Sequence, residues 1–188
     1  GYGKLNVEPY GGLIRNTWMD RPLSLSGAVA LRTEDPFAPS LRFVDFRRPL
    51  MLVPNLAIHM NRKVNEGVEL KPQKDLLPLF FQSADGGADD SNKLLALLAD
   101  ELRISSEDIM SYDLNVYPYE RGCLLGGDDA FLSAPRLDNL SSVKACVDAV
   151  RDWTDGDGIR IVALFDNEEV GSRTKQGAGS TALAMVLE

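Results

Sequence analysis

Apolar residues alternate with polar ones in one part of the chain and follow a helical period in others. Between residues 23 and 60, short apolar runs predict several strands, with Gly27–Arg32 and Leu41–Phe46 joined by a proline-bearing turn. No helical pattern separates these runs, and strands in quick succession indicate antiparallel β structure. Further strands are expected at Lys4–Val7, Leu50–Val53, Leu56–Met60 and Asp113–Tyr117.

Helical periodicity appears in two later segments. Leucines at helical spacing predict a helix over Ser91–Leu102, with an acidic cap at Asp89–Ser91. A second helix is expected from about Ser141 to Trp153, where valines and a cysteine recur at the same spacing. Ser105–Asp108 is typical of a short capped helix, and Gly122–Gly127 is expected to be a loop.

The segment Ile159–Phe165 is almost entirely apolar and β-branched. Such a run predicts a strand that is buried on both faces, as in the middle of a parallel sheet. Four polar residues follow directly, namely Asp166, Asn167, Glu168 and Glu169. In open α/β sheets, ligands bind beyond the carboxyl ends of the strands, so these residues are candidates for a substrate or metal site.

Glu168 and Glu169 are adjacent, and adjacent residues of a strand point to opposite faces. They can serve one site only if the chain turns there, which Gly171 and the following Gly- and Ser-containing loop permit. Two such glutamates can divide the work, one binding a metal while the other accepts a proton from water. The alternative is that these acidic residues form only a solvated loop.

Composition narrows the classes of function. The 188 residues are 44% apolar, which suffices for one good core or two small ones. A formal net charge of −8 argues against a nucleic-acid binder, because phosphate contacts need clustered Lys and Arg. No apolar run approaches the roughly 18 to 20 residues that span a bilayer. Cys123 and Cys146 are too few for a disulfide framework, which favours a reducing, cytoplasmic location.

The two ends of the sequence indicate a piece of a longer protein. The chain opens without Met in a loop-like stretch that is rich in glycine. It stops at Glu188, partway along a helical pattern that begins after Ser180. A helix that starts at such a cap normally continues for about ten residues or more.

Four blocks of this sequence together resemble the aspartyl aminopeptidase family of dinuclear zinc exopeptidases. They occur in the family's order and cover essentially the whole chain, and the block that contains the two glutamates is the most specific. The blocks are Tyr10–Gly12 with Thr17–Arg21, Pro54–Arg62, Ala134–Leu140 and Phe165–Ser172.

The resemblance implies roles for four residues. Asp138 corresponds to the carboxylate that bridges two zinc ions, and Glu169 corresponds to a terminal ligand of one of them. Glu168 corresponds to the general base that deprotonates the bridging water. His59 falls where the family carries a histidine that reaches into the neighbouring subunit's active site and helps to hold the substrate carbonyl and its oxyanion.

Each role has a structural alternative. Asp138 lies just ahead of a predicted helix, where a carboxylate is commonly only a cap. His59 lies in an apolar run and can be a satisfied, partly buried histidine without any ligand. Trp18 is expected to be a packing residue rather than a platform for a ligand.

The ligand set is incomplete in this chain. The family's two-zinc site also needs two histidines and another aspartate, and this sequence has a single histidine. Even catalytic zinc takes three protein ligands, whereas only Asp138 and Glu169 can be assigned here. We therefore expect that this polypeptide alone neither holds two zinc ions tightly nor hydrolyses peptides.

The resemblance also implies an architecture. The fold class is α/β, with fragments of a zinc-peptidase α/β sheet that flank an inserted, mainly-β dimerisation domain. Residues 1–21 and 134–188 are expected to be the catalytic-domain segments, and residues 22–133 the inserted dimerisation and assembly domain. The flanking segments should bury only part of a core.

The function implied is zinc-dependent removal of N-terminal residues from peptides, with acidic residues the family's usual substrates. Because no cationic group can be assigned to the pocket, a preference for neutral residues stays open. Two alternatives are a noncatalytic oligomerisation module and a related dinuclear aminopeptidase of the tetrahedral type. The expected partners are a peptide substrate and further copies of the chain, with no nucleic acid and no membrane.

Overall fold

A computed structural model describes residues 1–83, 92–154 and 156–188. The chain divides into two compact units. Unit 1 comprises Gly1–Glu8 and Ile14–Glu120, and unit 2 comprises Pro9–Leu13 and Arg121–Glu188. The predicted inserted domain at residues 22–133 stays a prediction.

The elements of unit 1 are mostly short. Its strands and helices, in chain order, are β1 (Tyr2–Lys4), η1 (Arg15–Trp18), β2 (Leu23–Leu31), β3 (Ser40–Asp45), η2 (Val64–Glu66), α1 (Pro72–Asp75), β4 (Leu79–Gln82), α2 (Lys93–Leu102), η4 (Ser106–Asp108) and β5 (Ile109–Pro118).

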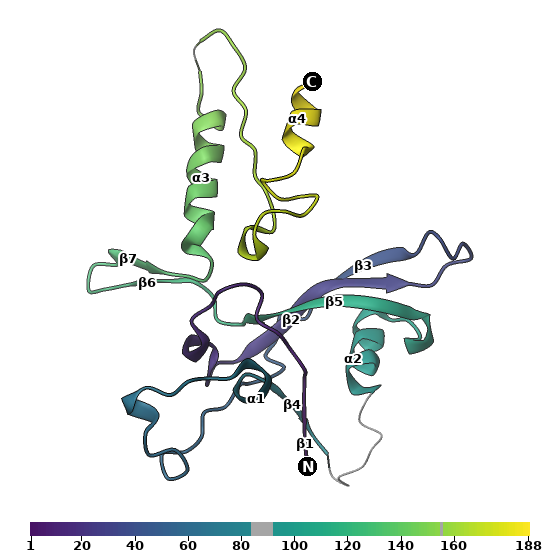
Figure 1. The fold of residues 1–188 in the computed structure, drawn as a ribbon, viewed down its shortest axis with the longest axis vertical. Coiled ribbons are helices and arrows are strands. Elements are labelled where there is room, and N and C mark those ends of the chain that lie inside the picture. Colours follow the sequence, from purple (N-terminus) through teal and green to yellow (C-terminus); the bar gives the residue numbers. More distant parts are fainter. Residues whose placement is uncertain (84–91, 155) are drawn as a thin grey trace. The chain divides into compact units, whose positions relative to one another are not determined.

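A three-stranded antiparallel sheet in the order β3-β2-β5 forms the centre of unit 1 (Figure 1). Ala28 of β2 lies opposite Phe43 of β3 on one side and Asp113 of β5 on the other. The predicted strand pair, its turn and the strand at Asp113–Tyr117 are therefore confirmed. A second, two-stranded sheet pairs β1 with β4, also antiparallel.

The core of unit 1 lies on one face of this sheet. Leu23, Leu25, Val29 and Leu31 of β2 are buried, as a period of two residues requires for one face of a strand. Helix α2 supplies Leu98, which is fully buried in the same cluster, and Trp18 packs against it. The predicted helix is confirmed as α2, while its predicted acidic cap at Asp89–Ser91 lies outside the described residues.

Several local predictions in unit 1 need correction. The first strand is Tyr2–Lys4 rather than Lys4–Val7. Residues 51–53 form only isolated bridges, with Met51 opposite Leu23 and Val53 opposite Met19. The predicted strand Leu56–Met60 is wrong, because these residues are not extended and paired: Met60 N donates to Ala57 O at 2.8 Å, which closes a turn.

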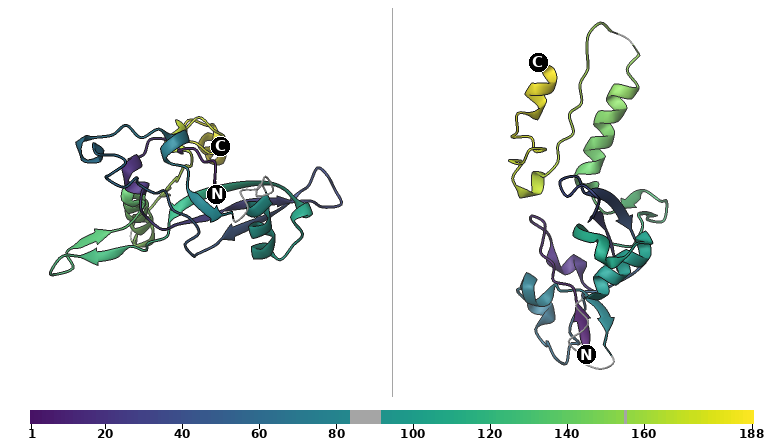
Figure 2. Two further views of the ribbon diagram at one scale, coloured as in Figure 1. Left: turned by 90° about the horizontal axis from the view of Figure 1, so that it is seen from below. Right: turned by 90° about the vertical axis from the view of Figure 1, so that its right-hand side faces the viewer.

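Unit 2 contains a hairpin, a long helix and an irregular C-terminal part (Figure 2). Its elements are β6 (Cys123–Leu125), β7 (Phe131–Ser133), α3 (Leu137–Arg151), η5 (Glu168–Val170) and α4 (Ala182–Leu187). β6 pairs antiparallel with β7, so the predicted loop at Gly122–Gly127 is in part a strand. The helix predicted at Ser141–Trp153 is confirmed within α3, and none of its residues is buried.

The run Ile159–Phe165 is neither a paired strand nor buried. After α3 the chain reverses and returns as an irregular segment (Figures 1 and 2). Ile159 is 89% exposed, and Ile161 and Leu164 are each 58% exposed. A strand of a parallel sheet needs hydrogen-bonded neighbours, and none of the described residues pairs with this run as a strand. The predicted buried central strand is therefore wrong for this structure.

The described part of the chain combines helices with several small antiparallel sheets, which is a mixed α/β fold. None of the described helices has the length and apolar character that crossing a membrane requires.

Candidate functional site

The two glutamates lie in a tight turn of unit 2. Glu168 and Glu169 begin the 3-10 helix η5, which is bounded by Asn167 and Gly171, both in the left-handed backbone region. Gly171 N donates to Glu168 O at 2.9 Å, and Ser172 N donates to Asn167 O at 3.0 Å. The predicted turn is thus present, and glycine suits the position where φ reaches 98°.

Side chains of the same loop hold this turn in place. Asp166 accepts a hydrogen bond from Asn167 N on its own Oδ1 at 2.7 Å, and Asn167 Nδ2 donates to Thr174 Oγ1 at 2.7 Å. The backbone N of Asp166 donates to Gln176 O at 3.1 Å. Residues 166–176 therefore form a loop that is held by hydrogen bonds among its own residues and carries two exposed glutamates.

A distant segment of the chain packs against this loop. Tyr10 Oη donates to Asn167 Oδ1 at 2.7 Å, across 157 residues of sequence. Gly11 follows with a φ of 75° and lies so close to Glu169 that a Cβ added there would be 2.7 Å from both Cβ and Oε2 of that glutamate. The Tyr10–Gly11 segment therefore binds the loop at Asn167 and lies against Glu169, with no room for a side chain at Gly11.

Asp138 lies at the irregular start of α3. Its backbone has φ −81° and ψ 112°, which is not helical, and the N-cap position belongs to Arg136. Leu140 N nevertheless donates to Arg136 O at 3.1 Å, so the turn closes around Asp138. The Asp138 carboxylate is exposed and accepts no hydrogen bond from the other described residues, so the capping alternative has no support in the described contacts.

His59 lies in unit 1, in the exposed turn at residues 58–60. Its neighbours Ile58 and Met60 are exposed apolar side chains. The alternative of a partly buried histidine in an apolar strand therefore does not describe this position. Glu168, Glu169 and Asp138 share unit 2, whereas His59 belongs to unit 1.

Asp20 holds the start of the segment that carries His59. Asn55 N donates to Asp20 Oδ1 at 2.9 Å, and Asn55 Nδ2 donates to Asp20 Oδ2 at 2.8 Å. The backbone and then the side-chain hydrogen bond from Asn55 lower the pKa of Asp20 below its ordinary value, because both favour the ionised carboxylate.

The described residues do not by themselves make a zinc site. Carboxylates such as those of Asp138 and Glu169 are suitable ligands, but zinc needs at least three protein ligands. Within residues 1–83, 92–154 and 156–188, no group of three His, Cys, Asp or Glu side chains gathers around one point.

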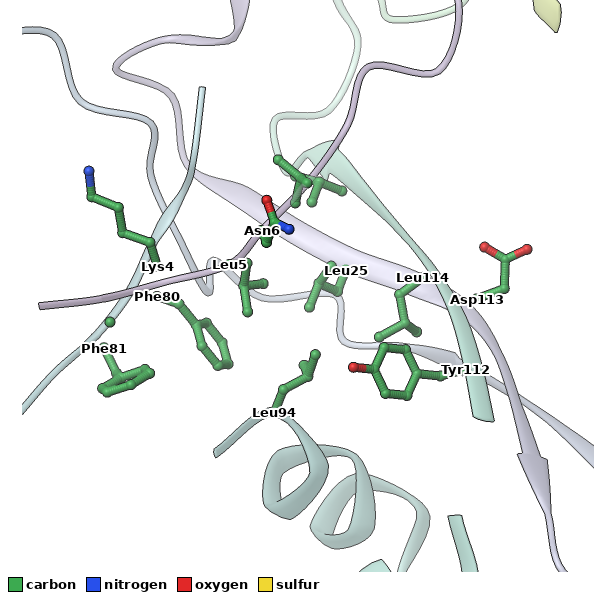
Figure 3. A pocket seen from close by; sticks show the side chains of 13 residues that line it. Lys4, Leu5, Asn6, Leu25, Phe80, Phe81, Leu94, Tyr112, Asp113 and Leu114 are labelled. Atoms are coloured by element: carbon green, nitrogen blue, oxygen red, sulfur yellow. The ribbon is translucent and has the colours of Figure 1, made fainter. Parts of the chain in front are cut away.

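Unit 1 also contains a hollow of about 500 Å³. Figure 3 shows Leu5, Leu25, Phe80, Leu94 and Tyr112 around it, while the Asp113 carboxylate and the Lys4 amine point away. None of the candidate catalytic or metal residues lines it. The hollow is lined mainly by apolar side chains, with the Tyr112 hydroxyl directed into it.

Sequence reasoning missed two contacts next to the candidate residues, the hydrogen bonds from Tyr10 to Asn167 and from Asn55 to Asp20. A signal was present, because all four residues lie in the blocks that carry the family resemblance. What the sequence does not show is which blocks touch, since the hydrogen bonds join positions that are 35 and 157 residues apart.

Comparison with known proteins identifies the family. The family model described as aminopeptidase I zinc metalloprotease (M18) matches residues 1–188. A probable M18 family aminopeptidase 2 of Clostridium novyi (strain NT) is 44% identical over 187 residues, which is all of this chain and 43% of that protein. This chain thus spans less than half the length of that relative.

Solved structures agree with this result. The structure of the Ape4 and Nbr1 complex matches all of this chain and 39% of that chain, with a TM-score of 0.89 and 33% identity. The S. cerevisiae mApe1 dodecamer matches all of this chain and 42% of that chain, with a TM-score of 0.76 and 26% identity. The resemblance seen in the sequence is confirmed, and this chain belongs to the M18 family of zinc metallo-aminopeptidases.

Proposed function

We propose that the protein of full family length, of which this chain forms part, removes N-terminal residues from peptides, acidic ones in preference. The observation that carries this proposal is the turned loop of unit 2, which presents Glu168 and Glu169 and is fixed by Tyr10 and Gly11. A loop that only needs to be solvated does not require a contact from 157 residues away.

The two glutamates take different roles in this proposal. Glu168 accepts the proton of the attacking water and later returns it to the amine that leaves. Glu169 and Asp138 would supply carboxylate oxygens to two zinc ions, together with ligands from outside this chain. Zinc, when bound, supplies a Lewis acid that polarises the scissile carbonyl.

His59 donates a hydrogen bond to the substrate carbonyl oxygen as negative charge develops there, in the active site of a neighbouring subunit. Its exposed position on a turn of unit 1, flanked by exposed Ile58 and Met60, supports a role in contact with another molecule. Hydrogen-bond donors placed at such an oxyanion typically contribute about 10²- to 10³-fold to kcat.

The proposal is tested with peptides that differ only in their first residue. The full-length protein, loaded with zinc, should release an N-terminal Asp or Glu faster than Leu, and should not act on N-acetylated peptides. A chelator should abolish the activity and added zinc should restore it. Equal rates for acidic and neutral residues would reject the acidic preference, and cleavage of acetylated peptides would reject exopeptidase action.

The isolated chain of 188 residues is expected to be inactive, since only two of the required ligands lie in it. Zinc titration by calorimetry should show no pair of tight sites on this polypeptide. Two tight sites would contradict the assignment of the remaining ligands to residues outside the chain.

We further propose that residues 22–133 form the inserted domain through which the protein self-associates; one of the similar solved structures is a dodecamer. Strand β3 supports this, because it is an edge strand whose Leu41 and Phe43 are 63% and 82% exposed. Exposed apolar residues on an edge strand are typical of surfaces that other chains cover. Phe43→Lys should lower the assembly state in light scattering, whereas an unchanged mass would place the interface elsewhere.

The alternative function, a noncatalytic oligomerisation module, is separated by the same measurements. A full-length protein that assembles but never hydrolyses a peptide with zinc present would favour it. A cytoplasmic location and the absence of nucleic-acid partners stay predictions from composition, and fractionation of cells tests the former.

A further inference from the structure

The segment that carries His59 is attached to the rest of unit 1 at one end. Asp20 N donates to Val53 O at 2.8 Å, and both carboxylate oxygens of Asp20 accept hydrogen bonds from Asn55. One residue thus binds the chain on both sides of Pro54, which has no N–H of its own.

Between Asn55 and His59 the chain is short and folds into a turn that is closed by its own backbone hydrogen bonds. Ala57 O accepts hydrogen bonds from Met60 N at 2.8 Å and Asn61 N at 3.2 Å. Only Leu56 separates this turn from Asn55, so the position of Asn55 sets the position of His59. Among the described residues, no side-chain hydrogen bond ties residues 56–62 to another segment.

Packing does not replace these hydrogen bonds. Leu56, Ile58 and Met60 are 58%, 54% and 75% exposed, so each apolar residue of this segment leaves more than half of its surface in solvent. The backbone of Asp20 is in the left-handed region, with φ 56°, which Asp tolerates better than most residues. In this backbone conformation both carboxylate oxygens of Asp20 face Asn55 and accept hydrogen bonds from it.

We propose that Asp20 is a positioning residue for His59: by binding Val53 and Asn55 it fixes the place from which His59 reaches the substrate carbonyl. This inference rests on the proposed role of His59 and adds to it the group that sets its geometry. A misplacement of about 1 Å at a catalytic group can cost about 10²-fold in rate, so loss of the carboxylate should be visible in kcat.

The test is a double-mutant cycle in the full-length, zinc-loaded protein. Asp20→Ala and His59→Ala should each lower kcat, the first by roughly 10- to 10²-fold and the second by about 10²-fold or more. In the double variant, the loss of Asp20 should cost nothing beyond the loss of His59, because Asp20 acts through that residue. Zinc content and assembly state should be those of the parent protein in all three.

Two further variants separate positioning from general damage. In Asp20→Asn, the amide that replaces the carboxylate can accept from Asn55 N and donate to the Asn55 side-chain oxygen once that amide is turned over. Its kcat should therefore stay within about threefold of the parent. Asp35→Ala is the matched control, because Asp35 Oδ1 also accepts a loop N–H, that of Phe37 at 2.9 Å, in another part of unit 1.

A direct measurement accompanies the kinetics. Hydrogen exchange of residues 53–61 should be faster in Asp20→Ala than in the parent and unchanged in Asp35→Ala. If His59→Ala leaves kcat unchanged, the proposed role of His59 fails and this inference fails with it. If His59→Ala is slow while Asp20→Ala is not, or if the two losses multiply in the double variant, Asp20 does not position His59 and the proposed function stands.

Discussion

Gly11 offers the sharpest test of how the glutamate loop is held. Its φ of 75° lies in the left-handed region, which costs an ordinary L-residue about 1–2 kcal/mol. In Gly11→Ala the new methyl would lie 2.7 Å from Glu169 Cβ and Oε2 and 2.8 Å from Glu169 O. Carbon atoms in contact normally lie about 3.5–4.0 Å apart, so the two segments must separate by about 1 Å.

The expected effect follows from what the displacement moves. Overpacking of this kind typically costs about 1–3 kcal/mol, and about 1.4 kcal/mol corresponds to a factor of ten in an equilibrium constant. If the strain is relieved by shifting Glu169, zinc affinity in the full-length protein should fall by about 10- to 10²-fold. Substitutions that disturb the support of a metal ligand usually have effects of this size.

Gly12→Ala is the matched control, because an added Cβ there meets nothing within 4 Å. Zinc content after dialysis and kcat should be measured for both variants and the parent. Gly12→Ala should match the parent, and Gly11→Ala should lose zinc. Equal zinc content and turnover in the two variants would refute the argument that the Tyr10–Gly11 segment fixes Glu169.

Three further predictions concern single side chains. Glu168→Gln in the full-length protein should keep its zinc but lose about 10²- to 10⁴-fold in kcat, since the proton acceptor is gone; near-normal kcat would place the base elsewhere. Glu169→Ala should instead lower zinc occupancy, measured by elemental analysis, and unchanged occupancy would count against it as a ligand. Tyr117→Phe should destabilise the chain by about 0.5 kcal/mol at pH 7, a low value for a lost hydrogen bond because Asp45 is 38% exposed and water screens the contact. The hydrogen bond from the Tyr117 hydroxyl is the largest cause of the lowered pKa of Asp45, and the hydrogen bond from Arg47 is the next. A carboxylate whose pKa is lower in the folded than in the unfolded state stabilises the fold above its unfolded pKa, and this contribution is lost as the pH falls through the folded pKa. The difference in thermal stability between Tyr117→Phe and the parent should therefore shrink below about pH 4, and a difference that does not change with pH would contradict this.

Much of the local structure could be predicted because its cause is local. The antiparallel pair β2 and β3 follows from alternating runs around a proline-bearing turn, and α2 follows from leucines at helical spacing. The turn at Glu168 and Glu169 was expected from Gly171, whose φ is positive in the structure. Such features depend on a few neighbouring residues and their backbone preferences.

The wrong predictions share a different cause. Ile159–Phe165 has the composition of a buried strand, but a strand forms only where another strand offers hydrogen bonds, and the described chain offers none to it. Leu56–Met60 is apolar as well, yet Ala57 O binds Met60 N and closes a turn. The composition of a segment shows whether it can form a strand, but whether it does so depends on the residues that lie next to it in the folded chain.

The sequence by itself determined the family, the candidate residues and the division into β-rich and helical parts. Only the tertiary structure decided that Tyr10 and Gly11 hold the glutamate loop and that Asp20 holds the segment of His59. The physical reason is that a hydrogen bond acts over about 3 Å, while its partners here are separated by 35 to 157 residues of chain. The path of the backbone brings such partners together, and that path depends on the packing of many residues at once.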